Sequence, residues 1–402
     1  MYLLGLGLVF ILIMEAPLEN YVNEVARSST SSLIGSQWLS SYIDPAHGNA
    51  YVFPDEDTTY SAAIRTKNIQ AINKAFFVSS DYTGPTPDIL NFMVFSMPSP
   101  DSPIVVAGDF YYMNNTTTVK ERRCIVLSDV QYTGYVDEIL QSRLIYKGFT
   151  LSYTGNAFDN QGFMSASTYN PSFGSGALNK QLADETTANQ TFLDCQYLPM
   201  SSREVANMNR DFEIFATSEG VYGVHKFNGS RSEYTNVGDS EGKFFFGCET
   251  GATTGLAGYR WRSYANRFMP PTNMDEKVSP YSMEVECLNN WNVVCVAVDG
   301  LSANQSLLLK YYQGSQVHFK PNSSLVAMQT YKGFLDNAAL TAASQLNSTL
   351  SCVYPSSYND FRAIWSKIRN FLKSSNGRNL VGAITSAVGP YGSLINAAYG
   401  LL

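Results

Sequence analysis

The sequence is poor in charge. Charged side chains make up only 15% of its 402 residues, well below the roughly 25% of an average globular protein. Surface helices need Glu and Lys on their wet faces, so this scarcity disfavours a helical protein. The net charge of −7 also argues against a body that binds nucleic acid in general. A surface with little charge suits burial against other subunits, because the cores of protein interfaces are depleted in charge.

Histidine and the common catalytic motifs are equally scarce. Only three histidines occur, His47, His225 and His318, which leaves few ligands for a catalytic metal and few bases for a triad. The sequence has no HExxH, GxSxG, P-loop or GxGxxG motif. We therefore expect no enzyme with an external substrate, and no cofactor.

Six cysteines are present, but no CxxC pair occurs. They are far apart and lie mostly in apolar runs, which is typical of buried free thiols rather than of a disulfide framework or a zinc site. The six are Cys124, Cys195, Cys248, Cys287, Cys295 and Cys352.

The N-terminal residues 2–14 are almost wholly apolar, yet they fit no targeting signal well. A basic n-region and a small-x-small cleavage site are both lacking, and the run is shorter than the roughly 20 residues of a membrane span. An alternative stays open, a secreted and glycosylated β-sandwich binding protein with residues 1–17 as its signal. Seven Asn-x-Ser/Thr sequons would then be glycosylated, at Asn114, Asn115, Asn189, Asn228, Asn304, Asn322 and Asn347.

Aromatic residues are abundant, at 13% of the chain with 26 Tyr and 23 Phe, and they favour strands. A Ser/Thr run at 28–36 predicts a flexible joint. From about residue 38 to 331 the sequence then reads as short strands divided by Gly, Pro, Asn and Asp, which indicates a sandwich or jelly roll. Strands are predicted at 60–69, 75–80, 89–95, 104–112, 143–153, 163–168, 212–217, 243–247, 283–287, 291–298 and 306–319.

The pattern changes near the C-terminus. Large apolar residues there follow the i, i+3, i+4, i+7 spacing of an amphipathic helix over 360–375, namely Phe361, Ile364, Trp365, Ile368, Phe371 and Leu372. Basic residues occupy the other positions and continue past them, at Arg362, Lys367, Arg369, Lys373 and Arg378. Residues 379–402 carry no charge. The segment is either a helix packed under the sheet or a peptide that meets RNA or membrane; its long uncharged continuation favours the second.

Paired carboxylates follow Pro54. Asp55, Glu56 and Asp57 are typical of a solvated turn. Carboxylate oxygens also bind calcium, so Asp55 and Asp57 are candidate ligands for Ca²⁺ held between subunits.

Several segments, in order along the chain, resemble the coat proteins of nodaviruses and, more distantly, tetraviruses. Residues 38–45 (WLSSYIDP) with 53–55 (FPD) are similar to the segment that leads into the shell domain of these proteins. Residues 143–148 (RLIYKG) through 160–162, and 291–294 (WNVV) through 319–321, resemble shell strands. Residues 363–375 (AIWSKIRNFLKSS) are similar to the start of the nodavirus membrane-lytic peptide.

The resemblance implies an all-β fold, an eight-stranded antiparallel jelly roll with elaborated loops and short terminal helices. Residues 38–331 would form the shell domain, with protruding loops at about 182–280. Residues 1–37 and 332–402 would be internal segments. The protein would assemble with copies of itself into an icosahedral shell around viral RNA, in the host cytoplasm and then in the virion. A host membrane and a host receptor would be later partners.

The resemblance also implies a single-turnover self-cleavage after assembly. In the family, an Asn side chain near the C-terminus attacks its own carbonyl carbon, helped by a buried acid. The matching bond is Asn359–Asp360. The alternative is that this Asn-Asp pair stands in a turn before the helix, with Asp360 near its N-cap. The acid position aligns with His47, a departure from the family, so Asp44 is the substitute candidate. The sequence also shows no Arg-rich N-terminal arm like that of the family. Either the C-terminal basic residues contact RNA, or the sequence does not begin at the usual start of the family.

Overall fold

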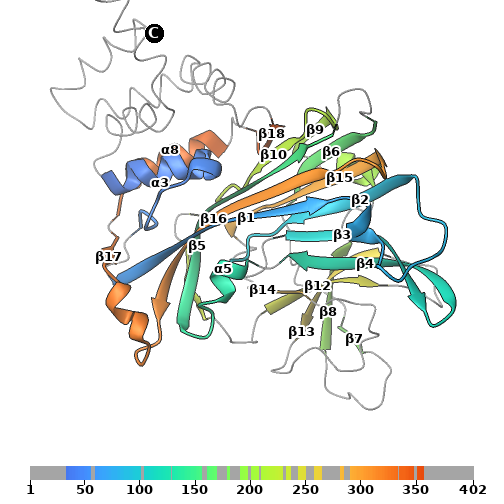
Figure 1. Cartoon of the computed structure of the whole chain (residues 1–402). Helices are drawn as coiled ribbons and strands as arrows, with labels where there is room; N and C mark the ends of the chain where they lie inside the picture. Colours follow the sequence, from blue (N-terminus) through green and yellow to red (C-terminus); the bar gives the residue numbers. More distant parts are fainter. Residues whose placement is uncertain are drawn as a thin grey trace, which may run out of the picture.

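A computed structural model of the chain describes residues 33–55, 59–100, 104–127, 129–155, 161–169, 179–181, 191–197, 201–207, 210–229, 232–236, 243–249, 258–264, 281–284, 290–333, 335–347 and 351–356. Within these residues, strands dominate and form three sheets (Figure 1). Helices are few and short. The two larger sheets face each other, and the third is built from segments inserted between their strands.

The first sheet has seven strands among the described residues. In spatial order they are β17 (Tyr331–Lys332), β1 (Tyr60–Ile72), β16 (Leu307–Phe319), β5 (Ile139–Tyr153), β10 (Val221–Val224) and β18 (Val353–Pro355), and β11 (Thr235–Asn236) also pairs with β5. The long pairing of β1 with β16 joins distant parts of the sequence, with Ala62 opposite Val317.

The second sheet has six strands in the described part of the chain. Their spatial order is β4 (Thr117–Leu127), β3 (Ile104–Asn114), β2 (Ile89–Ser96), β15 (Val293–Ser302), β6 (Phe163–Tyr169) and β9 (Arg210–Ala216). β3 and β4 form a hairpin whose far end extends beyond β2, because β2 pairs with β3 only as far as Gly108.

Eight of these strands make the predicted jelly roll. The first sheet holds β1-β16-β5-β10, and the second holds β2-β15-β6-β9. All six pairings are antiparallel. Two four-stranded sheets connected in this way are the jelly-roll arrangement. The prediction of an all-β jelly roll is therefore confirmed, with the remaining strands added at the sheet edges.

The third sheet comes from two insertions into the jelly roll. β7 (Asn179–Gln181) and β8 (Thr191–Tyr197) follow β6, while β12 (Lys243–Glu249), β13 (Gly258–Tyr264) and β14 (Tyr281–Glu284) precede β15. Figure 1 shows this sheet beside the edge strand β4. Most of it falls within the stretch 182–280 predicted to protrude, but that stretch also contains the jelly-roll strands β9 and β10. The domain boundaries themselves stay predictions.

The main core lies between the two jelly-roll sheets. It is lined by alternating residues of both, because successive side chains of a strand point to opposite faces. Leu307, Leu309 and Tyr311 of β16 point into it, together with Val294, Val296 and Val298 of β15. Each large apolar side chain buried in this way stabilises the fold by about 1.5–3 kcal/mol relative to an exposed one.

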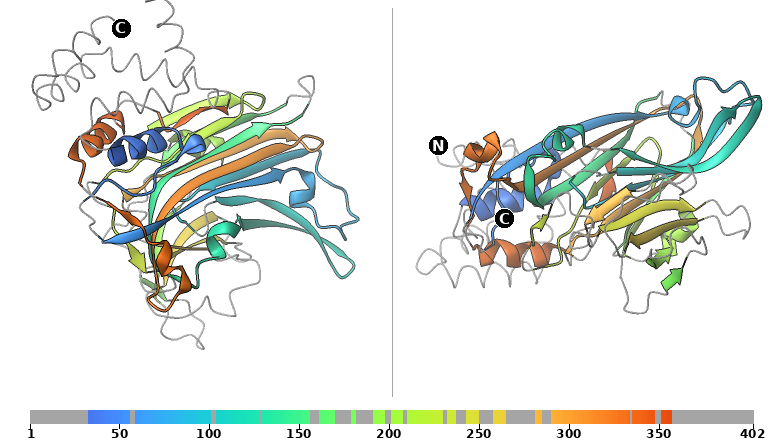
Figure 2. Two further views of the ribbon diagram at one scale, coloured as in Figure 1. Left: turned by 60° about the vertical axis from the view of Figure 1, so that its left-hand side comes forward. Right: turned by 90° about the horizontal axis from the view of Figure 1, so that it is seen from below.

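Two longer helices cover part of the outer face of the seven-stranded sheet. They are α3 (Leu33–Ile43) and α8 (Asn337–Asn347), which lie side by side in Figure 2. A short 3-10 turn, η1 (Pro45–His47), continues from α3. α3 begins inside the Ser/Thr run that predicted a flexible joint, and that prediction is wrong from Leu33 onward because the helix is held by its buried Trp38, Leu39 and Tyr42.

The remaining helical segments among the described residues are short: α4 (Lys74–Phe77), α5 (Val130–Thr133), α6 (Ser202–Asn207) and η4 (Ser324–Met328). The strand predicted at 75–80 is wrong, since α4 occupies its first part. The pattern of apolar residues at 75–80 is compatible with a strand as well as with a helical turn. Here Phe77 packs against Phe92 and Phe110, with ring centroids 5.1 and 5.2 Å apart, which favours the helical turn.

Candidate functional site

The terminal helices α3 and α8 meet the sheet through an aromatic cluster. The Trp38 ring lies 4.9 Å from Phe53, Phe53 lies 4.9 Å from Phe227, and Phe227 lies 5.3 Å from Trp291, all measured between centroids. The Trp38 indole also donates a hydrogen bond to the Ile145 carbonyl of β5, at 3.0 Å. The cluster therefore fixes helix α3 on the sheet.

The two helices approach each other closely because small residues face the contact. Ala339, Ala342 and Ala343 of α8 are buried in this cluster. On α3, a Cβ added at Gly35 would lie 2.7 Å from Asp336 Cγ and 2.9 Å from Ala339 Cβ, so a larger residue there would push the helices apart.

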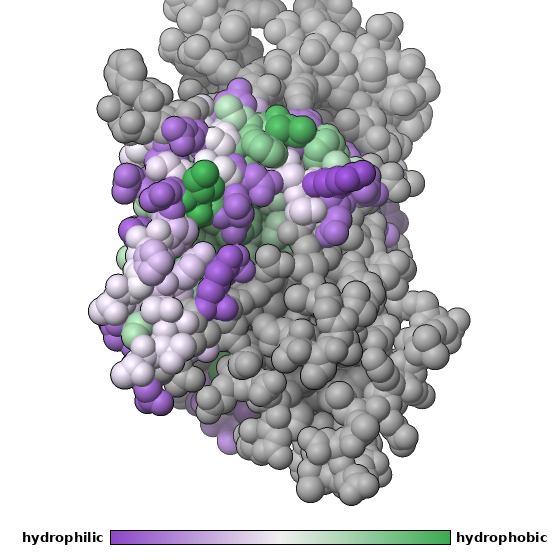
Figure 3. All heavy atoms as spheres, turned by 90° about the vertical axis from the view of Figure 1, so that its right-hand side faces the viewer, coloured by the Kyte–Doolittle hydropathy of each residue, from purple (hydrophilic) through white to green (hydrophobic). Residues whose placement is uncertain are grey.

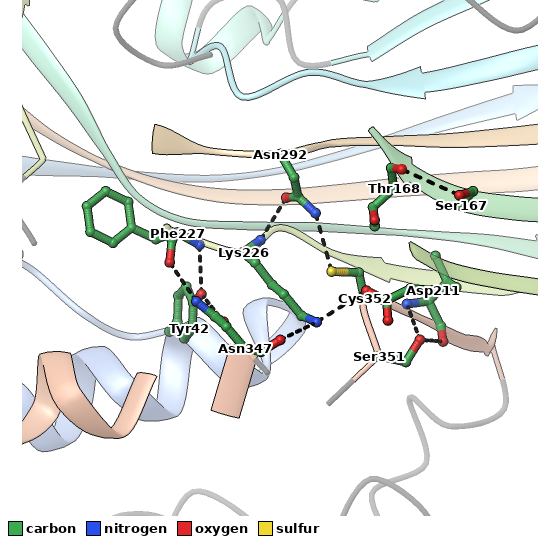
Figure 4. A network of polar contacts seen from close by, with 11 residues as sticks. Tyr42, Ser167, Thr168, Asp211, Lys226, Phe227, Asn292, Asn347, Ser351 and Cys352 are labelled. Carbon is green, nitrogen blue, oxygen red and sulfur yellow. Dashed lines mark hydrogen bonds and ion pairs between the residues drawn. The ribbon is translucent and has the colours of Figure 1, made fainter. Parts of the chain in front are cut away.

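A polar network ties the same helices to the strands (Figure 4). The Tyr42 hydroxyl of α3 donates to Asn347 Oδ1 at 2.6 Å and accepts from the Phe227 N–H at 2.7 Å. Asn347, the last residue of α8, also donates from Nδ2 to the Phe227 carbonyl at 2.6 Å. Burial raises the pKa of Tyr42 above its ordinary value. The hydroxyl thus stays protonated and holds α3, α8 and the chain after β10 together.

Lys226 extends this network to the C-terminal strand. Its Nζ donates to the Asn347 carbonyl at 3.0 Å and pairs with Asp211 Oδ2 at 3.2 Å. Its N–H donates to Asn292 Oδ1, and Asn292 Nδ2 contacts Cys352 Sγ at 3.3 Å (Figure 4). Asp211 adopts a φ of 62°, a conformation that Asp and Asn tolerate better than most residues. These contacts converge just before β18.

Strand β18 holds the last described residues against β10. Tyr222 pairs with Tyr354, and Val221 pairs with Pro355. The Ser356 N–H donates to the Glu219 carbonyl at 2.9 Å. The described residues end at Ser356, three positions before Asn359 in the sequence.

Asp44, the predicted helper acid of self-cleavage, lies next to this strand pair. The Tyr222 hydroxyl donates to Asp44 Oδ1 at 2.9 Å, and His47 Nδ1 lies 2.8 Å from Asp44 Oδ2. Burial and the neighbouring Asp44 charge raise the pKa of Tyr222 well above its ordinary value. Tyr222 thus remains a donor to Asp44. Its role could not be read from the sequence, because the two residues are 178 positions apart.

The second predicted carboxylate, Asp55, has a different partner. Both of its oxygens accept hydrogen bonds from the Arg143 guanidinium, and the two side chains are only 4% and 1% exposed. Gln316 Oε1 accepts two further bonds from Arg143. The Asp55 carboxylate is thus occupied inside the protein, which gives no support to the Ca²⁺ prediction at this residue. Asp57 lies outside the described residues. The role of Arg143 was not predicted, although a cation within a buried strand requires a partner.

Three further titratable groups of the described core, one histidine and two cysteines, are held in their neutral forms by burial. His225 is fully buried between Ser96 Oγ and the Asn292 carbonyl, at 2.7 Å from each. Burial, with the nearby Lys147 charge, lowers its pKa to about 3. Cys295 and Cys352 are free and buried, in line with the predicted reduced thiols, and burial raises the pKa of each thiol to about 12. Neither cysteine is a nucleophile near neutral pH.

The remaining predicted site residues lie outside the described residues. They are Asn359 and Asp360 of the cleavage site, all five predicted RNA contacts, and all six residues of the predicted membrane-active face. In the part of the chain that the structure describes, no helix is long and apolar enough to cross a membrane. The same residues include no group of three or more His, Cys, Asp or Glu that could hold a metal ion.

No known family model and no curated protein matches the sequence. The structure, however, is similar to solved structures of viral particles. VP2 of the infectious bursal disease virus subviral particle aligns with a TM-score of 0.50 and 10% identity, over 82% of this chain and 99% of that chain. The T13 particle of the same virus gives 0.50 and 10%, over 85% and 97%. At this identity the similarity concerns the fold. The narrower resemblance to nodaviruses and tetraviruses stays a prediction.

Proposed function

We propose that the protein is the coat protein of an icosahedral RNA virus, which assembles with copies of itself into a closed shell. The observation that carries the proposal is the arrangement of β1-β16-β5-β10 against β2-β15-β6-β9, a jelly roll shared with the viral particle proteins described above. The low charge of the chain suits extensive contacts between subunits.

Exposed apolar side chains supply candidate subunit contacts at one end of the jelly roll. They gather around α5, η4 and the start of β1. The most exposed of them is Val130 of α5, at 74%. Isolated apolar residues on a surface are ordinary, but a group of them marks an interaction site. The group, called the α5 patch, comprises Tyr60, Val130, Tyr135, Leu140, Val326 and Met328.

A second group lies at the opposite strand ends. Ile214 on the edge strand β9 is 60% exposed, and Phe163 on the neighbouring β6 is 42% exposed. The two lie on one face of the sheet as diagonal neighbours, because Ile214 is opposite Ser165 and Phe163 is opposite Ala216. Figure 3 faces this side of the molecule and shows hydrophobic surface among hydrophilic side chains in its upper part. Two different patches suit a shell, in which each subunit contacts several neighbours.

Self-assembly is the test of this proposal. Purified protein should sediment as uniform particles, visible by negative-stain microscopy. Val130→Asp and Ile214→Asp should each shift the population towards free subunits, because a charge placed in an apolar interface is costly. Thr117→Asp, on the exposed β3–β4 hairpin, is the control and should leave assembly unchanged. A clean monomer of the wild-type chain at high concentration would refute the proposal.

The intact mass of the protein distinguishes a coat protein from the secreted alternative. A secreted β-sandwich would lose residues 1–17 and gain glycans at its sequons, whereas a coat protein made in the cytoplasm would do neither. The same measurement on the chain released from particles therefore distinguishes the two functions.

The coat protein of a non-enveloped virus also needs a means of crossing a membrane, and we assign this role to residues 361–402. Six large apolar side chains on one helical face each contribute about 1.5–3 kcal/mol on burial, and each cation adds about 1 kcal/mol near an anionic surface. A synthetic 361–402 peptide should release dye from anionic liposomes, and Trp365→Glu should weaken the release. Liposomes that stay sealed would mean that the tail is a packing element.

A further inference from the structure

Three cations lie together on the outer face of the seven-stranded sheet. Arg65 and Lys67 of β1 point to this face, since Ala62, Thr66 and other alternate residues point inward. Lys310 of β16 points the same way, because its neighbours Leu309 and Tyr311 lie in the core. Ile69 pairs with Lys310, and Lys67 pairs with Tyr312. We call Arg65, Lys67, Ile69 and Lys310 the basic strip.

The charge of this strip is unlike that of the chain around it. The whole chain has a net charge of −7, yet β1 and β16 contain no Asp or Glu in their sequences. Among the described residues, no ion pair joins Arg65, Lys67 or Lys310 to a carboxylate. The positive charge is therefore not neutralised within the described part of the subunit.

Aromatic rings hold two of the three cations in place. The Arg65 guanidinium lies over the Tyr51 ring, 4.6 Å from its centroid, and also donates to Asn49 Oδ1. The Lys67 ammonium lies 5.2 Å from the centroid of Tyr312. Such contacts reduce the entropy that a long side chain loses when it binds a ligand. The strip is thus partly ordered before any partner arrives.

The strip is open, although the neighbouring part of the same face is covered. Over β5, the turn η1 packs so closely that a Cβ at Gly148 would lie 2.9 Å from Pro45 Cβ. Over β1, Arg65, Lys67 and Ile69 are all exposed, and Lys310 of β16 is half-buried. The strip therefore borders the layer of α3, η1 and α8, and the described chain begins at α3.

Charge decides between the possible occupants. Residues 357–402 carry five Lys or Arg and one Asp, so the positive strip repels them. Residues 1–32 carry three Glu and one Arg, but their main feature is the apolar run 2–14. Of the four residues of the basic strip, only Ile69 has a large apolar side chain that could contact such a run. A polyanion matches the strip better, because each cation that pairs with a phosphate releases a counterion.

We propose that the basic strip binds the phosphate backbone of single-stranded RNA, as a contact of the folded shell body separate from the C-terminal tail. This inference rests on the proposed coat-protein function. The strip adds three cations at fixed positions to the five of residues 362–378.

The test removes the three charges without removing the side-chain stems. Full-length Arg65→Gln/Lys67→Gln/Lys310→Gln is compared with a control of equal charge change, Lys74→Gln/Lys120→Gln/Arg203→Gln, whose residues lie on α4, β4 and α6. Binding of a fluorescent oligouridylate is measured from 50 to 200 mM salt. With roughly −0.7 per phosphate contact, the log–log salt slope of the strip variant should be shallower by about 2. Its particles should also package less RNA per shell.

Each outcome of this experiment either supports or overturns the inference. An unchanged slope in the strip variant, or an equal loss in the control, overturns the inference. Displacement of the oligouridylate by a peptide of residues 1–32, with no change of slope, would assign the strip to the N-terminal segment and overturn it as well. Failure of the wild-type chain to assemble refutes the proposed function separately, since the slope is measured on protein in either state.

Discussion

Asp55 is held by a residue far away in the sequence. As one of three successive acids after Pro54 it predicted a solvated turn or a calcium ligand, but Arg143, 88 positions later, occupies both of its oxygens. Local patterns carry no information on such a pair. The apolar strand around Arg143 was the available signal, because a cation in a buried strand requires a partner.

The pair should matter more to stability than a surface pair of the same kind. Asp55→Ala leaves the buried Arg143 cation without its carboxylate, so we expect a loss of about 3–5 kcal/mol in the free energy of unfolding. Asp109→Ala is the control, since Asp109 and Lys120 are 30% and 58% exposed, and its loss should stay below about 1 kcal/mol. Urea unfolding measures both. Equal losses would contradict the assignment of Asp55 to a buried pair.

At the scale of elements, the long strands were the most predictable, whereas several short or charged ones were missed. β1, β2, β3, β5 and β16 follow clear hydrophobic patterns, and each overlaps its predicted range. β4 was missed because its Lys120-Glu-Arg-Arg123 run is typical of a solvated loop. β10 has only four residues. α8 was missed because its buried side consists mainly of alanines, which give a weak periodic signal.

The Tyr42 hydroxyl is one of the groups that attach α3 and α8 to the sheet. Tyr42→Phe removes the bonds to Asn347 and the Phe227 N–H while it keeps the ring in the aromatic cluster. We expect a loss of about 1–3 kcal/mol, because buried partners remain unsatisfied, and faster amide exchange in α8.

Tyr82→Phe is the matched control. The Tyr82 hydroxyl donates to the Pro85 carbonyl at an exposed position, so its removal should change stability by less than about 0.5 kcal/mol. If amide exchange in α8 were the same in Tyr42→Phe as in the wild type, the network would not be what holds this helix.

At the scale of the whole molecule, the two residues predicted for self-cleavage come from opposite ends of the sequence. Asp44 is held by Tyr222 of β10, and β10 also pairs with β18, whose last residue, Pro355, precedes Asn359 by four positions. The roles of Asp44 as helper acid and of Asn359 as the cleaved residue stay predictions from the resemblance. The contact of Asp44 with Tyr222 could not be read from the sequence, because it depends on the completed sheet.

We therefore expect aged particles to contain a product that ends at Asn359. Asn359→Ala should abolish this product while particles still form, and Asp44→Asn should slow its appearance. Asp137→Asn, at an exposed position, is the control. Intact mass spectrometry over days follows the reaction. Wild-type particles that retain only the full-length mass would show that the bond is stable.

The pairing of Ala62 with Val317 also determines when, during translation, β1 can find its partner strand β16. A ribosome that adds 5–20 residues per second needs roughly 13–50 s to travel between these two positions. During that interval β1 has no β16 to pair with, so its backbone donors and acceptors must be protected from other nascent chains on the same messenger. A chain that terminates before β16 cannot pair β1 with it. This sheet therefore closes only after translation has passed Val317.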